Sequence, residues 1–375
     1  MDFSLSEEQQ LIKDSVDRFV REEYELDSRR KYMAAEGGFS RENWAKMAEL
    51  GWLGVSLPEE FGGFDGGPVE TMIIMESFGN GLVVEPFFPT VVLGANFLKM
   101  GASKDVKTAL LPKLAEGELM MAFAYAERQS RYNLGDVETT ATKDGDGYVL
   151  NGAKAVVLNA STADKIVVTA RTGGSSRDAN GVTCFLVDGD AAGLSRRDYP
   201  TVDGLQASEL TLENVTVGAD AVLGEVDNGL SLAETVADHG IAALCAEAVG
   251  CMSVLLDVTN EYLKTRKQFG VPIGKFQVLQ HRAVDMFMEV EQSRSMAYFA
   301  TLKLEEDASE RAKAASAAKV QIGKGGRYVG QQAVQLHGGM GMTDELNVGH
   351  FFKRLTMIEA MFGDQDHHLK KYASF

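Results

Sequence analysis

The pattern of apolar and polar positions changes twice along the chain. Near the start, apolar residues repeat at helical spacing after Ser6, which forms with Gln9 the Ser-x-x-Gln pattern of a helix-capping box. Further helices are predicted over residues 41–50, 69–80 and 104–111, separated by glycine-rich turns. The first third of the chain is therefore predicted to be helical.

Between about residues 121 and 224, short apolar runs bounded by turn residues replace the helical repeats. These runs lie at residues 148–150, 154–158, 165–170 and 183–187. The pair Asn151-Gly152, between the first two runs, is typical of a two-residue hairpin turn. The pattern predicts a β domain with its clearest hairpin at Asn151-Gly152.

From Leu230 onward the helical period returns in long stretches. Helices are predicted over residues 241–265, 278–303 and 312–336. Helices of this length present more apolar surface than one chain needs to bury, so we expect a four-helix bundle that packs against other subunits.

The order of these regions predicts an α+β fold class. It comprises an N-terminal helical domain, a middle β-barrel or sandwich domain and a C-terminal four-helix bundle, with bounds at 1–118, 119–226 and 227–375. A length of 375 residues, 45% of them hydrophobic, agrees with two or three domains at roughly 100–200 residues per domain.

The charge balance excludes some function classes. The chain carries 54 acidic and 37 basic side chains, a net charge of −17, which repels nucleic-acid backbones and anionic membranes. No run of 18 apolar residues occurs, and the first eight residues lack the pattern of a signal peptide. We therefore expect no nucleic-acid partner, no membrane insertion and a cytoplasmic location.

Cysteine and histidine spacing gives no sign of a metal centre. Cys184, Cys245 and Cys251 are odd in number and lack Cys-x-x-Cys spacing, so they predict small core residues rather than disulfides or zinc ligands. The pair His367-His368 is not part of a His-Glu-x-x-His motif. No metal site is predicted.

Three segments together resemble those of a known enzyme family. They read Arg266-Lys267-Gln268-Phe269-Gly270 within the stretch 262–277, Gln335-Leu336-His337-Gly338-Gly339-Met340-Gly341, and Leu110-Leu111-Pro112-Lys113-Leu114 followed by Ala124-Tyr125-Ala126-Glu127. In this order they resemble the acyl-CoA dehydrogenase family, and the resemblance extends over essentially the whole chain. The family has the same α, β, α order.

The resemblance implies a flavoprotein that binds FAD and oxidises an acyl-CoA to the 2,3-enoyl-CoA. In such enzymes a carboxylate removes the α-proton while hydride leaves for the flavin, and the electrons pass to electron-transfer flavoprotein or a similar acceptor. By resemblance, six residues contact FAD that is held mainly by a neighbouring subunit: Arg266, Gln268, Phe269, Gln335, Gly338 and Gly339.

The chemistry of these residues suits that role. A guanidinium offers a fork of donors to a pyrophosphate, an aromatic ring can cover a flat ring system, and paired glycines let backbone N–H groups approach a ligand. The alternatives are a salt-bridged Arg266, a core Phe269 and a pair of glycines, Gly338-Gly339, that only ends a helix.

The middle region departs from the family pattern at flavin-facing positions. Bulky Arg131 and Tyr132 stand where the family has glycine and serine, while Val156 and Leu158 replace a tryptophan and a threonine. Of the family's Thr-Glu-Pro loop only Glu127 remains. These losses predict that the flavin pocket of this chain's own β domain is degraded.

The family's catalytic carboxylate is also missing. An alignment on Arg354 places Gly363 opposite a glutamate, and the other known base position falls on Gly240, beside His239. Asp364 is the best candidate for the catalytic base within the chain, whereas His239, which could also act as a base, is expected to be a satisfied helix histidine. The alternative role of Asp364 is to cap the helix that follows.

These features favour one function and leave two others open. The chain is most similar to the small subunit of pimeloyl-CoA dehydrogenase-type two-subunit enzymes, in which FAD and the active site form at an interface with an unlike sister subunit. The first alternative is a self-sufficient homo-oligomeric dehydrogenase, or a related flavin oxidase, with Asp364 as base. The second is a non-catalytic structural or binding subunit.

Overall fold

The computed structural model describes residues 4–375, which group into two compact units. The first, here called the bundle unit, comprises the chain up to Arg30 together with Pro68–Val83 and Ile241–Phe375. The second, the sheet unit, comprises Lys31–Gly67 and Val84–Gly240. Residues 1–3, which begin the segment without a signal-peptide pattern, lie outside the described residues. The three-domain bounds stay a prediction.

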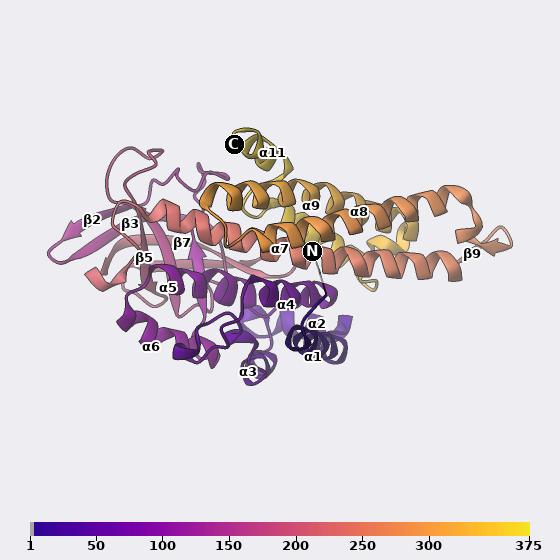
Figure 1. Cartoon of the computed structure of the whole chain (residues 1–375), viewed down its shortest axis with the longest axis horizontal. Helices are drawn as coiled ribbons and strands as arrows, with labels where there is room; N and C mark the ends of the chain where they lie inside the picture. The colour runs from indigo at the N-terminus through magenta and orange to yellow at the C-terminus, as the bar shows by residue number, and fades with distance from the viewer. Residues whose placement is uncertain (1–3) are drawn as a thin grey trace. The chain divides into compact units, whose positions relative to one another are not determined.

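Helices make up nearly all of the bundle unit (Figure 1). They are α1 (Glu7–Glu23), α2 (Leu26–Ala34), α4 (Pro68–Gly81), α7 (Gly229–Thr265), α8 (Gln277–Leu302), α9 (Ala308–His337), α10 (Val348–Ala360) and α11 (Gln365–Ala373), of which α2 and α7 extend into the sheet unit. The strands β9 (Lys267–Gln268) and β10 (Val271–Pro272) form a hairpin between α7 and α8. The prediction of long C-terminal helices is confirmed.

The first helix begins as its sequence predicts. The Ser6 hydroxyl accepts a hydrogen bond from the Gln9 N–H at 3.1 Å, and the Gln9 side chain accepts one from the Ser6 N–H at 3.0 Å. Both bonds satisfy backbone donors that the first turn of a helix leaves unpaired, so the capping box is confirmed.

The helix predicted over residues 241–265 begins earlier, at Gly229. Ala233 and Val236 continue its buried face towards the N-terminus. A glycine inside a helix costs only about 1 kcal/mol relative to alanine. Gly240 therefore interrupts the apolar pattern without ending the helix.

Two glycines let α4 and α7 cross closely within the bundle unit. A Cβ on Gly79 would lie 2.1 Å from the Glu247 carbonyl oxygen, and one on Gly250 would lie 2.0 Å from that of Glu76. No real Cβ comes this close to another backbone, so the crossing requires glycine at both positions.

A buried ion pair fixes α10 to α7. Arg354 Nε and Nη2 donate to the two carboxylate oxygens of Glu247 at 2.6 and 2.7 Å, and both side chains are only 6% exposed. This two-point geometry is the strong form of an arginine–carboxylate pair. Arg354, on which the alignment of the missing catalytic base depends, is therefore a residue of the bundle core.

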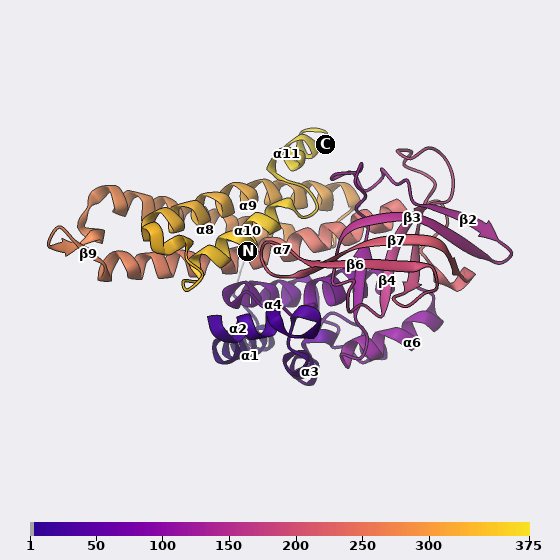
Figure 2. The ribbon, with the colours of Figure 1, turned by 180° about the vertical axis from the view of Figure 1, so that it is seen from behind.

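The sheet unit contains one large mixed sheet (Figure 2). Its strands are β1 (Met121–Ala124), β2 (Thr140–Asp144), β3 (Gly147–Leu158), β4 (Lys165–Arg171), β5 (Val182–Asp188), β6 (Leu194–Pro200), β7 (Gln206–Val217) and β8 (Val222–Leu223). They lie in the order β6-β7-β3-β2-β4-β5-β8, and β1 pairs in parallel with β4. The predicted middle β domain is thus present.

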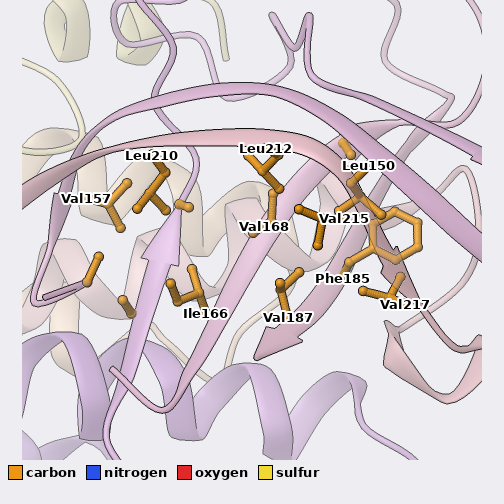
Figure 3. Close-up of a cluster of buried hydrophobic side chains, with 14 of the residues drawn as sticks. Leu150, Val157, Ile166, Val168, Phe185, Val187, Leu210, Leu212, Val215 and Val217 are labelled. Atoms are coloured by element: carbon orange, nitrogen blue, oxygen red, sulfur yellow. The ribbon is translucent and has the colours of Figure 1, made fainter. Parts of the chain in front are cut away.

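The core of the sheet unit is formed by alternate residues of its long strands (Figure 3). On β7, for example, Leu210, Leu212 and Val215 are buried, whereas Thr211 and Glu213 between them are exposed. Such alternation is expected of a sheet with one buried face. It leaves the opposite face of β3, β6 and β7 free to carry polar side chains.

The predicted hairpin turn at Asn151-Gly152 is wrong, because both residues lie inside β3. The turn lies earlier, at Gly145 and Asp146, between the paired residues Asp144 and Gly147. Gly152 instead marks a register shift against β7, and a Cβ there would lie 2.6 Å from the Thr139 hydroxyl oxygen. Glycine is needed at this position for a close approach within the sheet rather than for a turn.

Shorter helices complete the sheet unit. They are α3 (Arg41–Glu49), α5 (Ala95–Gly101) and α6 (Lys104–Ala115), with a π-helical segment at Phe88–Gly94 and 3₁₀ turns at Glu36–Gly38, Trp52–Gly54, Glu59–Phe61 and Ala219–Ala221. In the bundle unit, 3₁₀ turns lie at Ile273–Lys275 and Gly338–Met342. The helices predicted over residues 41–50, 69–80 and 104–111 are confirmed as α3, α4 and α6.

The three cysteines are free and buried, as predicted for small core residues. One helix, α7, is long and apolar enough to span a membrane by length and composition, but 78% of its most apolar stretch is buried inside the protein. That burial is the property of a core helix.

Candidate functional site

The two C-terminal motif segments lie side by side at one end of the bundle unit, here called the bundle tip. The tip comprises residues 262–276, which include the hairpin β9–β10, and residues 335–342 at the end of α9. The rings of Tyr262 and His337 are in contact, tilted by 33° with their centroids 4.4 Å apart, which joins the ends of α7 and α9. The structure thus brings together Arg266 and Gly338, which are far apart in the sequence.

The motif side chains of the bundle tip are exposed. Phe269 is 90% exposed, and Arg266, Gln268 and Gln335 also lie at the surface. Within residues 4–375 the Arg266 guanidinium makes no hydrogen bond or ion pair, and no atom lies within 4 Å of a Cβ built on Gly338 or Gly339. The alternatives of a salt-bridged arginine and a core phenylalanine are therefore wrong.

Phe269 also holds an unusual backbone conformation, with a φ of +54°. Phe269 and Gly270, which has a φ of +82°, form the two-residue turn between the paired residues Gln268 and Val271, and the favoured turns of this kind need a positive φ at both positions. A bulky residue adopts this conformation only with strain. Among the described residues the Phe269 ring has one aromatic neighbour, Phe276, in an edge-on contact with the centroids 6.2 Å apart. The free guanidinium, the open ring and the unobstructed glycine backbone of the tip fit the parts of FAD that the family resemblance assigns to it.

Asp364 lies in the turn between α10 and α11 and caps α11. Its carboxylate accepts a hydrogen bond from the His367 N–H at 2.8 Å, which is the geometry of an N-cap. The capping alternative is thus observed, and a role as base stays a prediction. The other base position, Gly240, offers only the half-buried His239 beside it.

The turn at Asp364 is far from the bundle tip. Lys319 on α9 contacts this turn, and Gln335 on the tip is 16 positions further along the same helix, which corresponds to about 24 Å at about 1.5 Å per residue. The tip and Asp364 of one chain therefore cannot serve the same reacting atoms. The structure keeps the predicted cofactor residues together and separates them from the predicted base.

A buried lysine holds the turn in place. The Lys319 ammonium donates to the carbonyl oxygens of Ile358, Glu359 and Gly363 at 2.7, 2.8 and 2.9 Å. These acceptors match its three donors and cap the C-terminus of α10. Burial lowers the pKa of Lys319 to about 8, so it remains charged at neutral pH.

In the sheet unit, the surviving family residue Glu127 is part of a buried ion pair. Its carboxylate accepts from Lys154 Nζ at 2.7 Å and from the N–H groups of Glu138 and Thr139 at 2.8 and 3.1 Å. Burial alone would raise the pKa of Glu127, but the charge of Lys154 and the hydrogen bonds from Lys154, Gln129 and Thr139 together outweigh it and lower the pKa to about 2. Lys154 also donates to Thr169 at 3.0 Å. Glu127 is therefore a structural anchor of the loop rather than an available base.

The positions of the sheet unit that the family resemblance places against flavin have an unusual backbone and lack the family's side chains. Val156 has a φ of +51° beside a register shift in β3, and Arg131 has a φ of +50° in the loop after β1. A β-branched residue at positive φ is a genuine outlier. Val156 is 46% exposed and offers neither a ring nor a hydroxyl group. The lack of a ring and a hydroxyl group at this position agrees with the prediction that the flavin pocket of the β domain has lost its ligand-binding side chains.

A groove of about 850 Å³ runs over the outer face of β3, β6 and β7, wholly within the sheet unit. Sequence reasoning did not identify it. Several of its charged side chains have partners nearby: Arg128 lies 3.9 Å from Glu209, which accepts from the Tyr199 hydroxyl at 3.0 Å, and Arg197 lies over the Tyr199 ring. This internal pairing assigns no ligand to the groove.

Comparisons with known proteins identify the family. Three domain models of acyl-CoA dehydrogenase match the chain: the N-terminal domain at residues 6–118, the middle domain at 122–215 and the C-terminal domain at 227–374.

Individual relatives cover nearly the whole chain. The probable acyl-CoA dehydrogenase YngJ of Bacillus subtilis is 32% identical over 96% of this chain and 95% of its own length. The caffeyl-CoA reductase-Etf complex subunit CarC of Acetobacterium woodii is 31% identical over 84% of each chain. The ChsE4-ChsE5 complex of Mycobacterium tuberculosis contains a chain with a TM-score of 0.90 at 26% identity, covering 100% of this chain and 98% of that one. The chain therefore belongs to the acyl-CoA dehydrogenase family of FAD-dependent oxidoreductases.

Proposed function

We propose that this chain is one subunit of a two-subunit acyl-CoA dehydrogenase that oxidises an acyl-CoA to the 2,3-enoyl-CoA. FAD and the active site lie at the interface with an unlike sister subunit, which supplies the main flavin pocket and the catalytic carboxylate. The resemblance to pimeloyl-CoA dehydrogenase-type small subunits belongs to this proposal.

The observation that carries the proposal is the state of the bundle tip. Its Arg266 guanidinium makes no hydrogen bond or ion pair among residues 4–375, and its Phe269 ring, which contacts Phe276 edge-on, is 90% exposed. Exposed aromatic rings and free guanidinium groups are the side chains that dominate binding interfaces. The exposure of these side chains supports the proposal that a ligand or another subunit binds at the tip.

A second line of support comes from the positions where this chain would serve its own flavin. Val156 and Leu158 lack the ring and the hydroxyl group, and Gly363 and Gly240 lack a carboxylate. One such loss could be compensated locally. Several losses that concern one reaction favour a site that is no longer used here.

The known relatives agree with a partnered enzyme. The ChsE4-ChsE5 protein is a complex of two components, and CarC is a subunit of a complex with Etf. We infer a sister subunit of similar fold, an electron-transfer flavoprotein or similar acceptor, and a cytoplasmic location.

FAD, when bound, would supply the hydride acceptor for this reaction. The residues of this chain would hold it: the Arg266 fork neutralises a pyrophosphate, Phe269 covers a ring, and the backbone N–H groups at Gly338 and Gly339 approach without a Cβ in the way. Gln268 and Gln335 offer both donors and acceptors to the nucleotide.

One observation favours the self-sufficient alternative. Asp364 is a half-buried carboxylate directly after the position that aligns with the family's glutamate. Its cap bond at 2.8 Å occupies one of its two oxygens. A homo-oligomer with Asp364 as base is therefore the second candidate, and a non-catalytic subunit is the third.

Flavin content separates these candidates. The chain is purified alone and together with the protein encoded beside it, and the flavin absorption of each preparation is recorded with an acyl-CoA turnover assay. From the chain alone we expect little bound flavin and no acyl-CoA turnover. From the pair we expect both bound flavin and turnover. A yellow, active single chain would overturn the proposal, whereas a yellow pair in which only the partner binds flavin would favour the non-catalytic reading.

A further inference from the structure

The turn Phe362-Gly363, where the family resemblance expects a catalytic carboxylate, has a backbone that disfavours side chains. Gly363 has a φ of +122°, a conformation that residues with a Cβ rarely adopt, and Phe362 before it has a φ of +57°. Restoring a side chain at residue 363 would strain the backbone before any contact is considered.

The space beside Gly363 is also filled. A Cβ on Gly363 would lie 2.6 Å from His367 Cδ2 and 2.7 Å from His368 Nε2. Both distances are shorter than any normal carbon contact. The two imidazole rings, from the first turns of α11, occupy the place where the first atom of a side chain would lie.

His368 is fixed from two sides and cannot swing away easily. It is 1% exposed, its Nε2 lies 3.0 Å from the Phe362 carbonyl oxygen, and its Nδ1 lies 3.2 Å from Ser316 Oγ. A carbonyl oxygen only accepts, so Nε2 carries the proton and Nδ1 accepts from the serine hydroxyl. Burial and the charge of Lys319 lower the pKa of His368 to about 3, which keeps the ring neutral.

The backbone on the other side of the turn is held as well. Lys319 binds the Gly363 carbonyl oxygen at 2.9 Å together with two carbonyl oxygens at the end of α10. The turn is therefore tied to α9 through both Lys319 and Ser316. It has no direction in which to open without breaking these bonds.

We propose that His367, His368 and Lys319 keep the base position of this subunit closed, so that residue 363 admits no side chain and Gly363→Glu does not restore a catalytic carboxylate. That residue 363 is a base position rests on the proposed function, whereas the closure itself rests on contacts within the bundle unit. The base position does more than lack a carboxylate, because the His367 and His368 side chains of α11 occupy the space that a side chain on residue 363 would need.

A thermal-unfolding cycle on the full chain tests the closure. Gly363→Ala is compared with Gly62→Ala, a matched control at a φ of +84° where no atom lies within 4 Å of the built Cβ. We expect Gly363→Ala to lower the midpoint by about 3 °C or more beyond the control. In a His367→Ala/His368→Ala background this extra drop should shrink to less than half, since the colliding atoms are gone.

Two outcomes of the unfolding cycle would overturn the closure. One is a Gly363→Ala midpoint equal to that of the control. The other is an unchanged drop in the double-alanine background, which would attribute the whole effect to backbone strain. Turnover of butyryl-CoA by the purified Gly363→Glu chain with added FAD would also overturn it. Turnover by the unmodified single chain would instead contradict the proposed function and leave the unfolding cycle unaffected.

Discussion

The bundle tip and the Phe362-Gly363 turn belong to the same unit, but the positions that the family uses are exposed at the tip and enclosed by other residues at the turn. At the tip, Arg266 has no partner among residues 4–375 and Phe269 is 90% exposed. At the turn, Lys319 and His368 bond to backbone carbonyls and leave no room for a side chain on Gly363. The tip is therefore accessible to a ligand from outside the chain, whereas the space at the turn is filled by side chains of the chain itself.

This difference shows which of the family's positions this chain can still use. A buried polar group must find partners within the chain, because an unsatisfied one costs about 1–3 kcal/mol. The exposed Arg266 guanidinium makes no hydrogen bond or ion pair among residues 4–375, so no such internal contact holds it. The sheet unit resembles the turn in this respect, since its surviving family residue Glu127 is bound internally by Lys154.

The largest effect is expected where an internal contact is broken in the sheet unit. Lys154→Met leaves the buried Glu127 carboxylate without its counter-charge, and removal of one partner of a buried pair typically costs about 3–5 kcal/mol. Urea unfolding of the isolated chain measures this loss. The double variant Lys154→Met/Glu127→Gln should recover much of it. A loss below about 1 kcal/mol for the single variant would show that Glu127 is not an internally fixed group.

Sequence periodicity predicted most of the architecture because helices and half-buried strands have distinct apolar periods. It failed at Asn151-Gly152, where the local turn signal was overridden by pairing of β3 with β7. It also placed the start of this helix at residue 241, whereas α7 begins at Gly229. At Asn151-Gly152 the glycine has a tertiary rather than a local role, because a Cβ there would lie 2.6 Å from the Thr139 hydroxyl oxygen.

The site was predictable only in part. The tip residues form compact motifs, so the sequence could name them, although it could not show that Arg266 and Gly338 lie at the same end of the bundle. The contacts of Lys319 with Gly363 and of Lys154 with Glu127 join residues 44 and 27 positions apart. A lysine at such a separation has no spacing rule that would identify its partner, so these anchors appear only in three dimensions.

The tip should show the reverse of the Lys154 result, with a loss of binding and no loss of stability. Arg266→Ala removes charge-assisted hydrogen bonds to a pyrophosphate, worth roughly 1.5–3 kcal/mol, so FAD affinity of the assembled enzyme should fall about 10- to 100-fold. Unfolding of the isolated chain should change by less than about 0.5 kcal/mol, because the side chain is exposed and unpaired among residues 4–375.

A neighbouring exposed cation gives the control for Arg266. Lys264→Ala removes a side chain whose only described partner is the weak surface pair with Glu261 at 3.8 Å. It should leave FAD affinity within about twofold, as expected for a surface charge. Equal losses of FAD affinity for Lys264→Ala and Arg266→Ala would show that the tip acts only through its positive charge. Unchanged FAD affinity for both variants would show that the tip does not bind the cofactor.

The smallest effect is expected at Asp364, and its size decides whether the turn holds a base or only a helix cap. Loss of an N-cap costs about 1 kcal/mol, whereas loss of a general base costs about 10²–10⁴ in rate. Asparagine caps helices as well as aspartate but cannot accept the proton. Asp364→Ala should therefore destabilise the chain by about 1 kcal/mol and Asp364→Asn by much less, while the partnered enzyme keeps its rate with both, measured as acyl-CoA turnover. A loss of 10²-fold or more in Asp364→Asn, with stability unchanged, would make Asp364 the base and the chain self-sufficient in its chemistry.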